Sequence, residues 1–314
     1  NNKDPGKQFA WMRKVLSHCR DNGTQAIIVG HIPPAIGNFR HTQLWRDGYI
    51  QSYYDIVKEF DNVIIAQLFG HLHSDEFRIG LVDEGTNPTA NFTMIPSMNT
   101  PILFGPSITP LHGNDPSLRL VKYDKGGAGS GPNGGKYRLL DYESHRLSIG
   151  ASDKHWSRLY TFSEAYPMLK EDGLSSEVFR TIVESMEDNR GKESPALQLY
   201  RSLMLSGADG NDHSAGEGVN VNCDSSCRDE YLCTLQSATS AGYDNCLLER
   251  KQSWIDNGKS IFGLVVASLF VIVAVAFFII RWKKKNKRDD YESTPSVTGI
   301  GHSDELDAKD QEII

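Results

Sequence analysis

Three histidines follow two apolar stretches of the sequence, each at a point where a buried strand is expected to end. His31 comes directly after "AIIVG" (26–30), and His71 and His73 come after "NVIIAQLFG" (62–70). The glycine before His31 and before His71 permits a sharp turn of the backbone. The two strands are expected to be parallel neighbours, and ligand sites in such sheets gather beyond the carboxyl ends of the strands. The sequence therefore predicts that the three imidazoles converge on one crevice.

Neutral imidazole is a common zinc ligand, so this convergence indicates a metal site. Residues two apart in an extended segment point to the same side, so His71 and His73 are expected to face one pocket and to serve two different ions. Metal pairs about 3.5–4 Å apart clamp the oxygens of a phosphoryl group during in-line displacement. A single histidine at a strand end is usually a hydrogen-bonded loop residue. Three such histidines, His31, His71 and His73, instead favour a role as metal ligands.

The elements around these histidines predict an α/β core. The apolar run at 26–30 is typical of a strand buried on both faces. A second amphipathic helix is expected at 49–60, and the order strand, helix, strand predicts a right-handed crossover between parallel strands. A first helix is expected before residue 22, because apolar residues recur there at helical spacing, and Asn22-Gly23 ends it. The apolar residues are Phe9, Met12, Leu16 and Cys19.

Beyond residue 77 the pattern becomes antiparallel and then helical. Short strand candidates occur at 77–82, 91–96, 118–124 and 136–143, and a glycine-rich loop lies at 126–135. From residue 155 onward the pattern indicates helices, beginning with "RLYTFSEAYPML". The chain is therefore expected to divide into an α/β part at 1–150 and a helical part at 151–255.

An apolar stretch at 261–280, "IFGLVVASLFVIVAVAFFII", predicts one transmembrane helix, because it would span roughly 30 Å. A buried core helix is the alternative. The basic cluster that follows, "RWKKKNKR", predicts that residues 281–314 form a disordered cytosolic tail and that the preceding ectodomain is lumenal or extracellular. The net charge of −7 argues against a nucleic-acid partner.

An exported segment should tolerate oxidation and glycosylation. The sequence has two N-glycosylation triplets, at Asn22 and Asn91. An even cluster of cysteines in such a segment indicates two disulfides, with the pairing left open. A zinc site is the alternative, although no C-x-x-C pair is present. Cys19, on the apolar side of the first helix, is expected to be a buried free thiol. The clustered cysteines are Cys223, Cys227, Cys233 and Cys246.

The motifs "VGHIPP" and "AQLFGHLHSDEF" resemble the last two metal-binding motifs of the calcineurin-like metallophosphoesterases, and more narrowly those of the acid sphingomyelinase-like phosphodiesterases. The resemblance implies that 1–150 is the C-terminal part of a metallophosphoesterase sandwich, with mixed β-sheets flanked by helices. A small helical subdomain with two disulfides would follow it. The resemblance also implies two zinc ions, one held by His31 and His71 and the other by His73. The implied disulfides are Cys223–Cys227 and Cys233–Cys246.

The implied function is a membrane-anchored, metal-dependent phosphodiesterase that hydrolyses a phosphodiester, such as sphingomyelin to ceramide and phosphocholine. The earlier motifs of that family, a D-x-H sequence, a bridging aspartate and an Asn-His pair, do not occur before His31. The chain is therefore predicted to be a C-terminal fragment with no catalytic residue of its own. Alone it is expected to bind metal poorly and to be inactive, because imidazoles without a carboxylate do not offset the repulsion of two dications. The alternatives are an endopolyphosphatase or nucleotide phosphodiesterase of the same fold, or a non-catalytic membrane-anchored ectodomain.

Overall fold

The computed structural model describes residues 4–80, 93–111, 114–124, 137–150, 152, 154–168, 173–187, 194–204 and 223–292. The chain forms two compact units, 1–251 and 252–314. The predicted α/β part and nearly all of the predicted helical part lie in the first unit. The glycine-rich stretch at 126–135 and most of the predicted tail lie outside the described residues.

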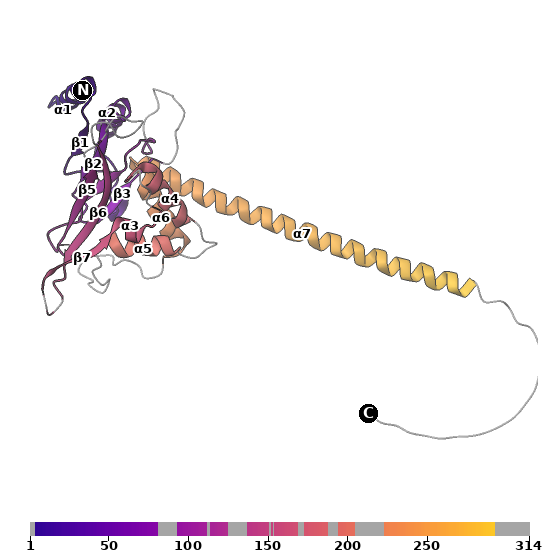
Figure 1. Ribbon diagram of the computed structural model, residues 1–314. Coiled ribbons are helices and arrows are strands. Elements are labelled where there is room, and N and C mark those ends of the chain that lie inside the picture. The colour runs from indigo at the N-terminus through magenta and orange to yellow at the C-terminus, as the bar shows by residue number, and fades with distance from the viewer. Residues whose placement is uncertain are drawn as a thin grey trace, which may run out of the picture. The chain divides into compact units, whose positions relative to one another are not determined.

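Helices and strands alternate in the first part of the chain, and helices dominate after residue 162 (Figure 1). The helices are α1 (Gln8–Asp21), the 3₁₀ turn η1 (Phe39–His41), α2 (Asp47–Glu59), α3 (Phe162–Ala165), α4 (Ser176–Glu187), α5 (Pro195–Met204), α6 (Ser225–Gln236) and α7 (Ser240–Glu292). The strands are β1 (Ala26–Val29), β2 (Ile64–Phe69), β3 (Glu76–Arg78), β4 (Ile102–Phe104), β5 (Ser117–Asp124), β6 (Arg138–Leu147) and β7 (Trp156–Thr161).

A four-stranded sheet carries the predicted histidine motifs. Its strand order is β1-β2-β4-β3, with β1 and β4 parallel to β2 and with β3 antiparallel to β4. The predicted parallel pairing of the first two strands is therefore confirmed. Strand β4 was not predicted, because three residues are too few to show a periodicity.

A second sheet is antiparallel, with the order β5-β6-β7. The prediction of a helical pattern from residue 155 is wrong for its first part, where Trp156–Thr161 forms strand β7 and pairs with β6. Tyr160, opposite Ser144 in that pairing, is buried, so the burial of the aromatic ring against the sheet overrides the apparent helical pattern. Helix α3 begins directly after this strand and covers four residues only.

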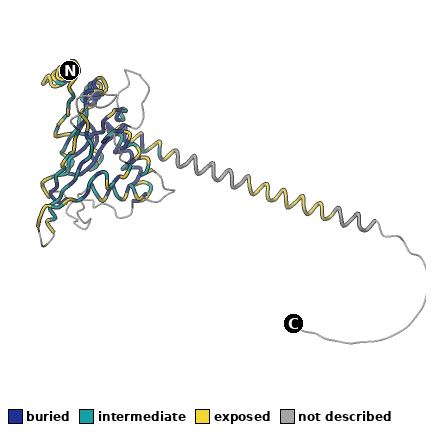
Figure 2. The backbone as a smooth tube through the Cα atoms, in the orientation of Figure 1, coloured by how far each residue is buried: buried dark blue, intermediate teal, exposed yellow. Residues whose placement is uncertain are grey.

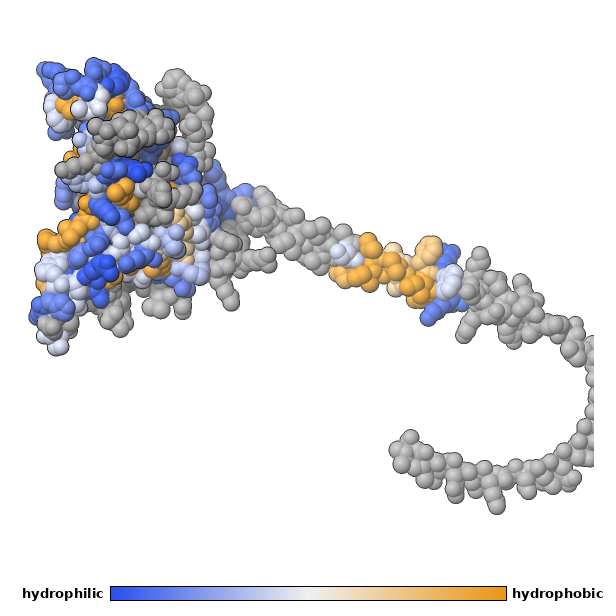
Figure 3. All heavy atoms as spheres, viewed as in Figure 1, coloured by the Kyte–Doolittle hydropathy of each residue, from blue (hydrophilic) through white to orange (hydrophobic). Residues whose placement is uncertain are grey.

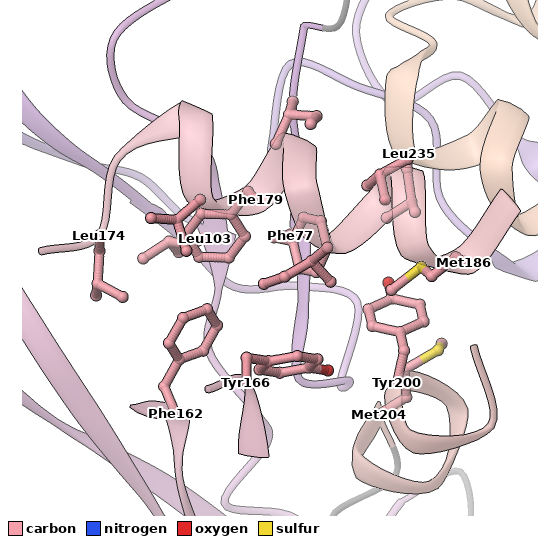
Figure 4. Packing of buried hydrophobic residues seen from close by; sticks show 14 of the residues in the cluster. Phe77, Leu103, Phe162, Tyr166, Leu174, Phe179, Met186, Tyr200, Met204 and Leu235 are labelled. Carbon is pink, nitrogen blue, oxygen red and sulfur yellow. The ribbon is translucent and has the colours of Figure 1, made fainter. Parts of the chain in front are cut away.

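The larger hydrophobic core lies between the sheets and helices α4, α5 and α6. Figure 4 shows Phe77 of β3 at its centre, 4.7 Å from the ring centroid of Phe179 and 5.3 Å from that of Tyr200. A second core joins α1 and α2 to the four-stranded sheet. Helix α1 is exposed along most of its length and buries only Leu16 fully, whereas α2 buries most of one face (Figure 2).

Strand β1 differs from expectation in its burial. Ile27 is 48% exposed and Val29 is 76% exposed, so the prediction of a strand buried on both faces is wrong. Ala26 and Ile28 point the other way and pack against the core that contains α1 and α2. Among the described strands β1 is at the edge of its sheet and pairs only with β2, and its burial alternates along the strand, so one face packs on the core and the other is exposed.

The structure contradicts the single-pass topology predicted from the apolar stretch at 261–280, and it does not support the predicted span or the membrane partner. No helix in the part of the chain that the structure describes is both long enough and apolar enough to cross a bilayer. Exposed apolar side chains run along α7 from Leu269 to Ile280, and Arg281 follows them (Figure 3).

Candidate functional site

Parallel pairing of β1 with β2 places two loops at the same edge of the sheet. His31 follows β1 after Gly30, and His71 follows β2 after Gly70. The pairing continues past the strands, because the backbone N–H of Gly70 donates to the carbonyl oxygen of His31 at 3.0 Å. A backbone hydrogen bond therefore holds the start of the His31 loop against the end of β2.

The rings of His31 and His71 lie side by side at this edge. Their centroids are 5.2 Å apart and their planes are at 77°. Desolvation lowers the pKa of His71 below the ordinary value, and the electrostatic influence of His31 and His73 lowers it further. His71 is therefore held in the neutral form, which is the form that binds a metal.

The backbone of the second loop is strained. His71 has a φ of 74° and His73 a φ of 57°, both in the left-handed region that residues with a side chain rarely adopt. The expectation that 71–73 is extended is therefore wrong, and the alternation rule does not apply to these two side chains. Strain of this kind persists only where surrounding contacts over-determine the conformation, and it clusters at functional sites.

The residues at this edge fit part of a zinc site. His31 and His71 supply two adjacent imidazoles, the ligand type that zinc accepts. Within the described residues, no group of three or more His, Cys, Asp or Glu side chains is arranged to hold a metal ion. The two carboxylates that follow His73 point elsewhere: Asp75 pairs with Arg119, and Glu76 pairs with Arg78 at 2.8 Å.

Asp75 anchors the strained loop to the second sheet. Its buried carboxylate forms an ion pair with Arg119 and accepts hydrogen bonds from Tyr160 at 2.9 Å and from Ser144 at 3.1 Å. Burial raises the pKa of the Tyr160 hydroxyl, and the nearby Asp75 raises it further, so this phenol remains a donor. Burial alone would lower the pKa of Arg119, but Asp75, Tyr142 and Tyr160 raise it. These polar residues were not predicted from the sequence.

The four clustered cysteines lie near the C-terminal end of the first unit in the sequence. The structure contains the disulfides Cys223–Cys227 and Cys233–Cys246, which is the pairing that the resemblance implies. The second disulfide packs with Ile36, a fully buried residue five positions after His31. The cysteine-bearing segment thus supports the loop that carries the first histidine.

Three further sites were predicted from the sequence. Asn22, the first predicted glycosylation site, is exposed after α1, and its side-chain amide donates to the carbonyl of His18 at 2.8 Å. Asn91 lies outside the described residues. Cys19 is a free, partly buried thiol that packs against the core containing α1 and α2.

Gly30 is required by close packing between the strands. A Cβ added there would lie 2.5 Å from Cε1 of Phe69, which is buried in the core. Replacing Gly30 with alanine should lower the free energy of unfolding by about 1–3 kcal/mol, because the ring or the backbone must shift. Urea denaturation measures this change. Gly48→Ala is the matched control: an added Cβ there meets nothing within 4 Å, so a comparable loss in that variant would contradict the packing argument.

Comparison with known proteins gives the family context. No protein-family model matches the chain. The acid sphingomyelinase-like phosphodiesterase 3b of Homo sapiens is 26% identical over 254 residues, or 78% of this chain and 49% of that protein. The cyclic GMP-AMP phosphodiesterase of Mus musculus is 25% identical over 260 residues, or 79% and 50%. The sphingomyelin phosphodiesterase of Homo sapiens is 32% identical over 173 residues, or 53% and 24%.

These similarities confirm the predicted resemblance to the acid sphingomyelinase-like phosphodiesterases. The chain spans about half the length of the curated relatives that it matches most extensively.

Proposed function

We propose that this chain supplies histidine ligands to a zinc-dependent phosphodiesterase. The observation that carries the proposal is the pair of rings, His31 and His71, at the carboxyl ends of two parallel strands. Ligand sites in sheets with parallel strands form at that edge. The names of the relatives support the reaction class, because each of those reported above is named as a phosphodiesterase.

The histidines have distinct roles in this proposal. His31 and His71 hold one zinc ion, and His73 ligates a second. Bound zinc polarises a phosphoryl oxygen and lowers the pKa of water toward neutrality. The lowered pKa of His71 keeps its ring available as a ligand under mildly acidic conditions. Asp75 and Glu76 take no part as ligands, because their charges are already neutralised by buried arginines.

The substrate class is a phosphodiester, and the relatives favour two candidates. Relatives are named for sphingomyelin, which has a phosphocholine head group, and for cyclic GMP-AMP, which is a dinucleotide. Release of phosphocholine from sphingomyelin is the first assay, and hydrolysis of cyclic GMP-AMP is the second. Both assays use the natural protein, with and without added zinc.

Calorimetric titration of the natural protein with zinc tests the proposal at the level of these residues. Zinc should bind at pH 7, and its affinity should fall as protons compete for the imidazoles. Because the pKa of His71 lies below its ordinary value of about 6.5, this fall should occur at a lower pH than for an unperturbed histidine pair. Absence of zinc binding at pH 7, or hydrolysis of both substrates undiminished by a chelator, would refute the proposal.

A further inference from the structure

Arg78 lies between the two loops that carry the histidines. Its side chain is 0% exposed, and its guanidinium donates to Glu76 Oε2 at 2.8 Å. On its other side, Nη2 donates to the carbonyl oxygen of Ile36 at 3.2 Å. Ile36 belongs to the loop that begins at His31, whereas Glu76 follows the loop that contains His71 and His73.

The contacts of Arg78 continue into both loops. Nη2 lies 3.4 Å from Oδ1 of Asn38, two residues beyond Ile36. On the other side, the hydroxyl of Ser74 donates to Oε1 of Glu76, and Ser74 directly follows His73. A short series of buried polar contacts therefore connects one histidine-bearing loop to the other through a single guanidinium.

We infer that Arg78 is a positioning residue that fixes the His31 loop relative to the strained turn at His71 and His73. The effect of Arg78 on metal binding rests on the proposed function, since the spacing of the two loops would set the spacing of the histidine ligands. A buried ion pair by itself is weak support for stability, because desolvation offsets much of the attraction. The guanidinium of Arg78, however, donates to a carboxylate and to a carbonyl at the same time, and this fixes the position of one loop relative to the other.

Hydrogen exchange at the amide of Gly70 tests the inference without any metal, because that N–H donates to His31 across the two loops. Arg78→Met alone would leave the carboxylate of Glu76 buried and uncompensated and could unfold the chain. The informative variant is therefore the double replacement Glu76→Gln with Arg78→Met. It leaves no charge at either position and no donor to the carbonyl oxygen of Ile36. Exchange at Gly70 should become roughly tenfold faster or more in this variant.

Two references separate positioning from general destabilisation. The amide of Gly105 donates to Phe69 at 2.8 Å at the neighbouring strand end, and its exchange should stay unchanged. Arg228→Met combined with Asp229→Asn removes another buried ion pair, on helix α6, and should leave Gly70 protected. Unchanged exchange at Gly70 in the double variant, or an equal rise at Gly70 and Gly105, would overturn the inference.

Zinc binding then tests the link to function. In the natural protein, the double variant should bind zinc at least roughly tenfold more weakly than the unmodified form, in line with the loss on removing groups that orient ligands. If the unmodified natural protein binds no zinc, the proposed function fails, while the exchange at Gly70 still decides the role of Arg78. If zinc affinity is unchanged although Gly70 exchanges faster, the consequence for ligand spacing is wrong.

Discussion

Replacing His71 with alanine should weaken zinc binding by about 100-fold or more. The loss of an orienting group around a metal typically costs about 10–100-fold in affinity, and loss of a ligand should reach or exceed the upper end. His71 is the central member of the proposed site, since its ring lies 5.2 Å from that of His31 and the electrostatic influence of both His31 and His73 lowers its pKa. Calorimetric titration with zinc at pH 7 measures the effect. Hydrolysis by the natural protein should fall with it.

His145→Ala is the matched control for this prediction. His145 lies on β6, outside the loops that follow β1 and β2, and its Nε2 is 3.0 Å from Oε2 of Glu143. Its replacement removes one imidazole and should leave the zinc affinity unchanged. If His71→Ala and His145→Ala bind zinc equally well, then the histidine pair at the sheet edge is not a metal site.

Replacing Arg119 with methionine should lower the free energy of unfolding by about 3–5 kcal/mol. Removal of one partner of a buried ion pair leaves the other charge uncompensated, and that is the source of the loss. Arg119 and its partner Asp75 are almost wholly buried, and Arg119 also donates to the carbonyl of Phe104 at 3.1 Å. Denaturation in urea at pH 7 measures the change.

Two further variants make this stability prediction specific. Lys122→Met, on the same strand but exposed, should change stability by no more than about 0.5 kcal/mol. Asp75→Asn combined with Arg119→Met should recover much of the loss, because no uncompensated charge remains. A large loss in the Lys122 variant, or no recovery in the double variant, would show that the ion pair is not the cause.

The sequence predicts the first half of the structure well, because strong local signals coincide there. The run "AIIVG" and the run "NVIIAQLFG" are bounded by turn residues, and helical spacing separates them. Two parallel strands joined by one helix can be arranged in few ways, so the meeting of His31 with His71 follows from topology. Burial was harder to predict: Ile27 and Val29 look like core residues, yet one face of β1 is open.

The supporting residues could not be predicted, because their partners are distant in the sequence. Asp75 contacts Ser144 and Tyr160, which are 69 and 85 positions away. Arg119 lies between two leucines on β5 and carries no local sign of a buried partner. The left-handed backbone at His71 and His73 was also not predicted, since residues with a side chain rarely adopt it.

The packing of Ile36 against Cys233–Cys246 ties the His31 loop to the redox state of sulfur atoms about two hundred positions further along the chain. In a reducing compartment the free thiols would no longer hold α6 to the start of α7, and the packing of the two cysteines against Ile36 would loosen. The cellular environment in which the polypeptide matures thus becomes a condition for the geometry of its imidazoles.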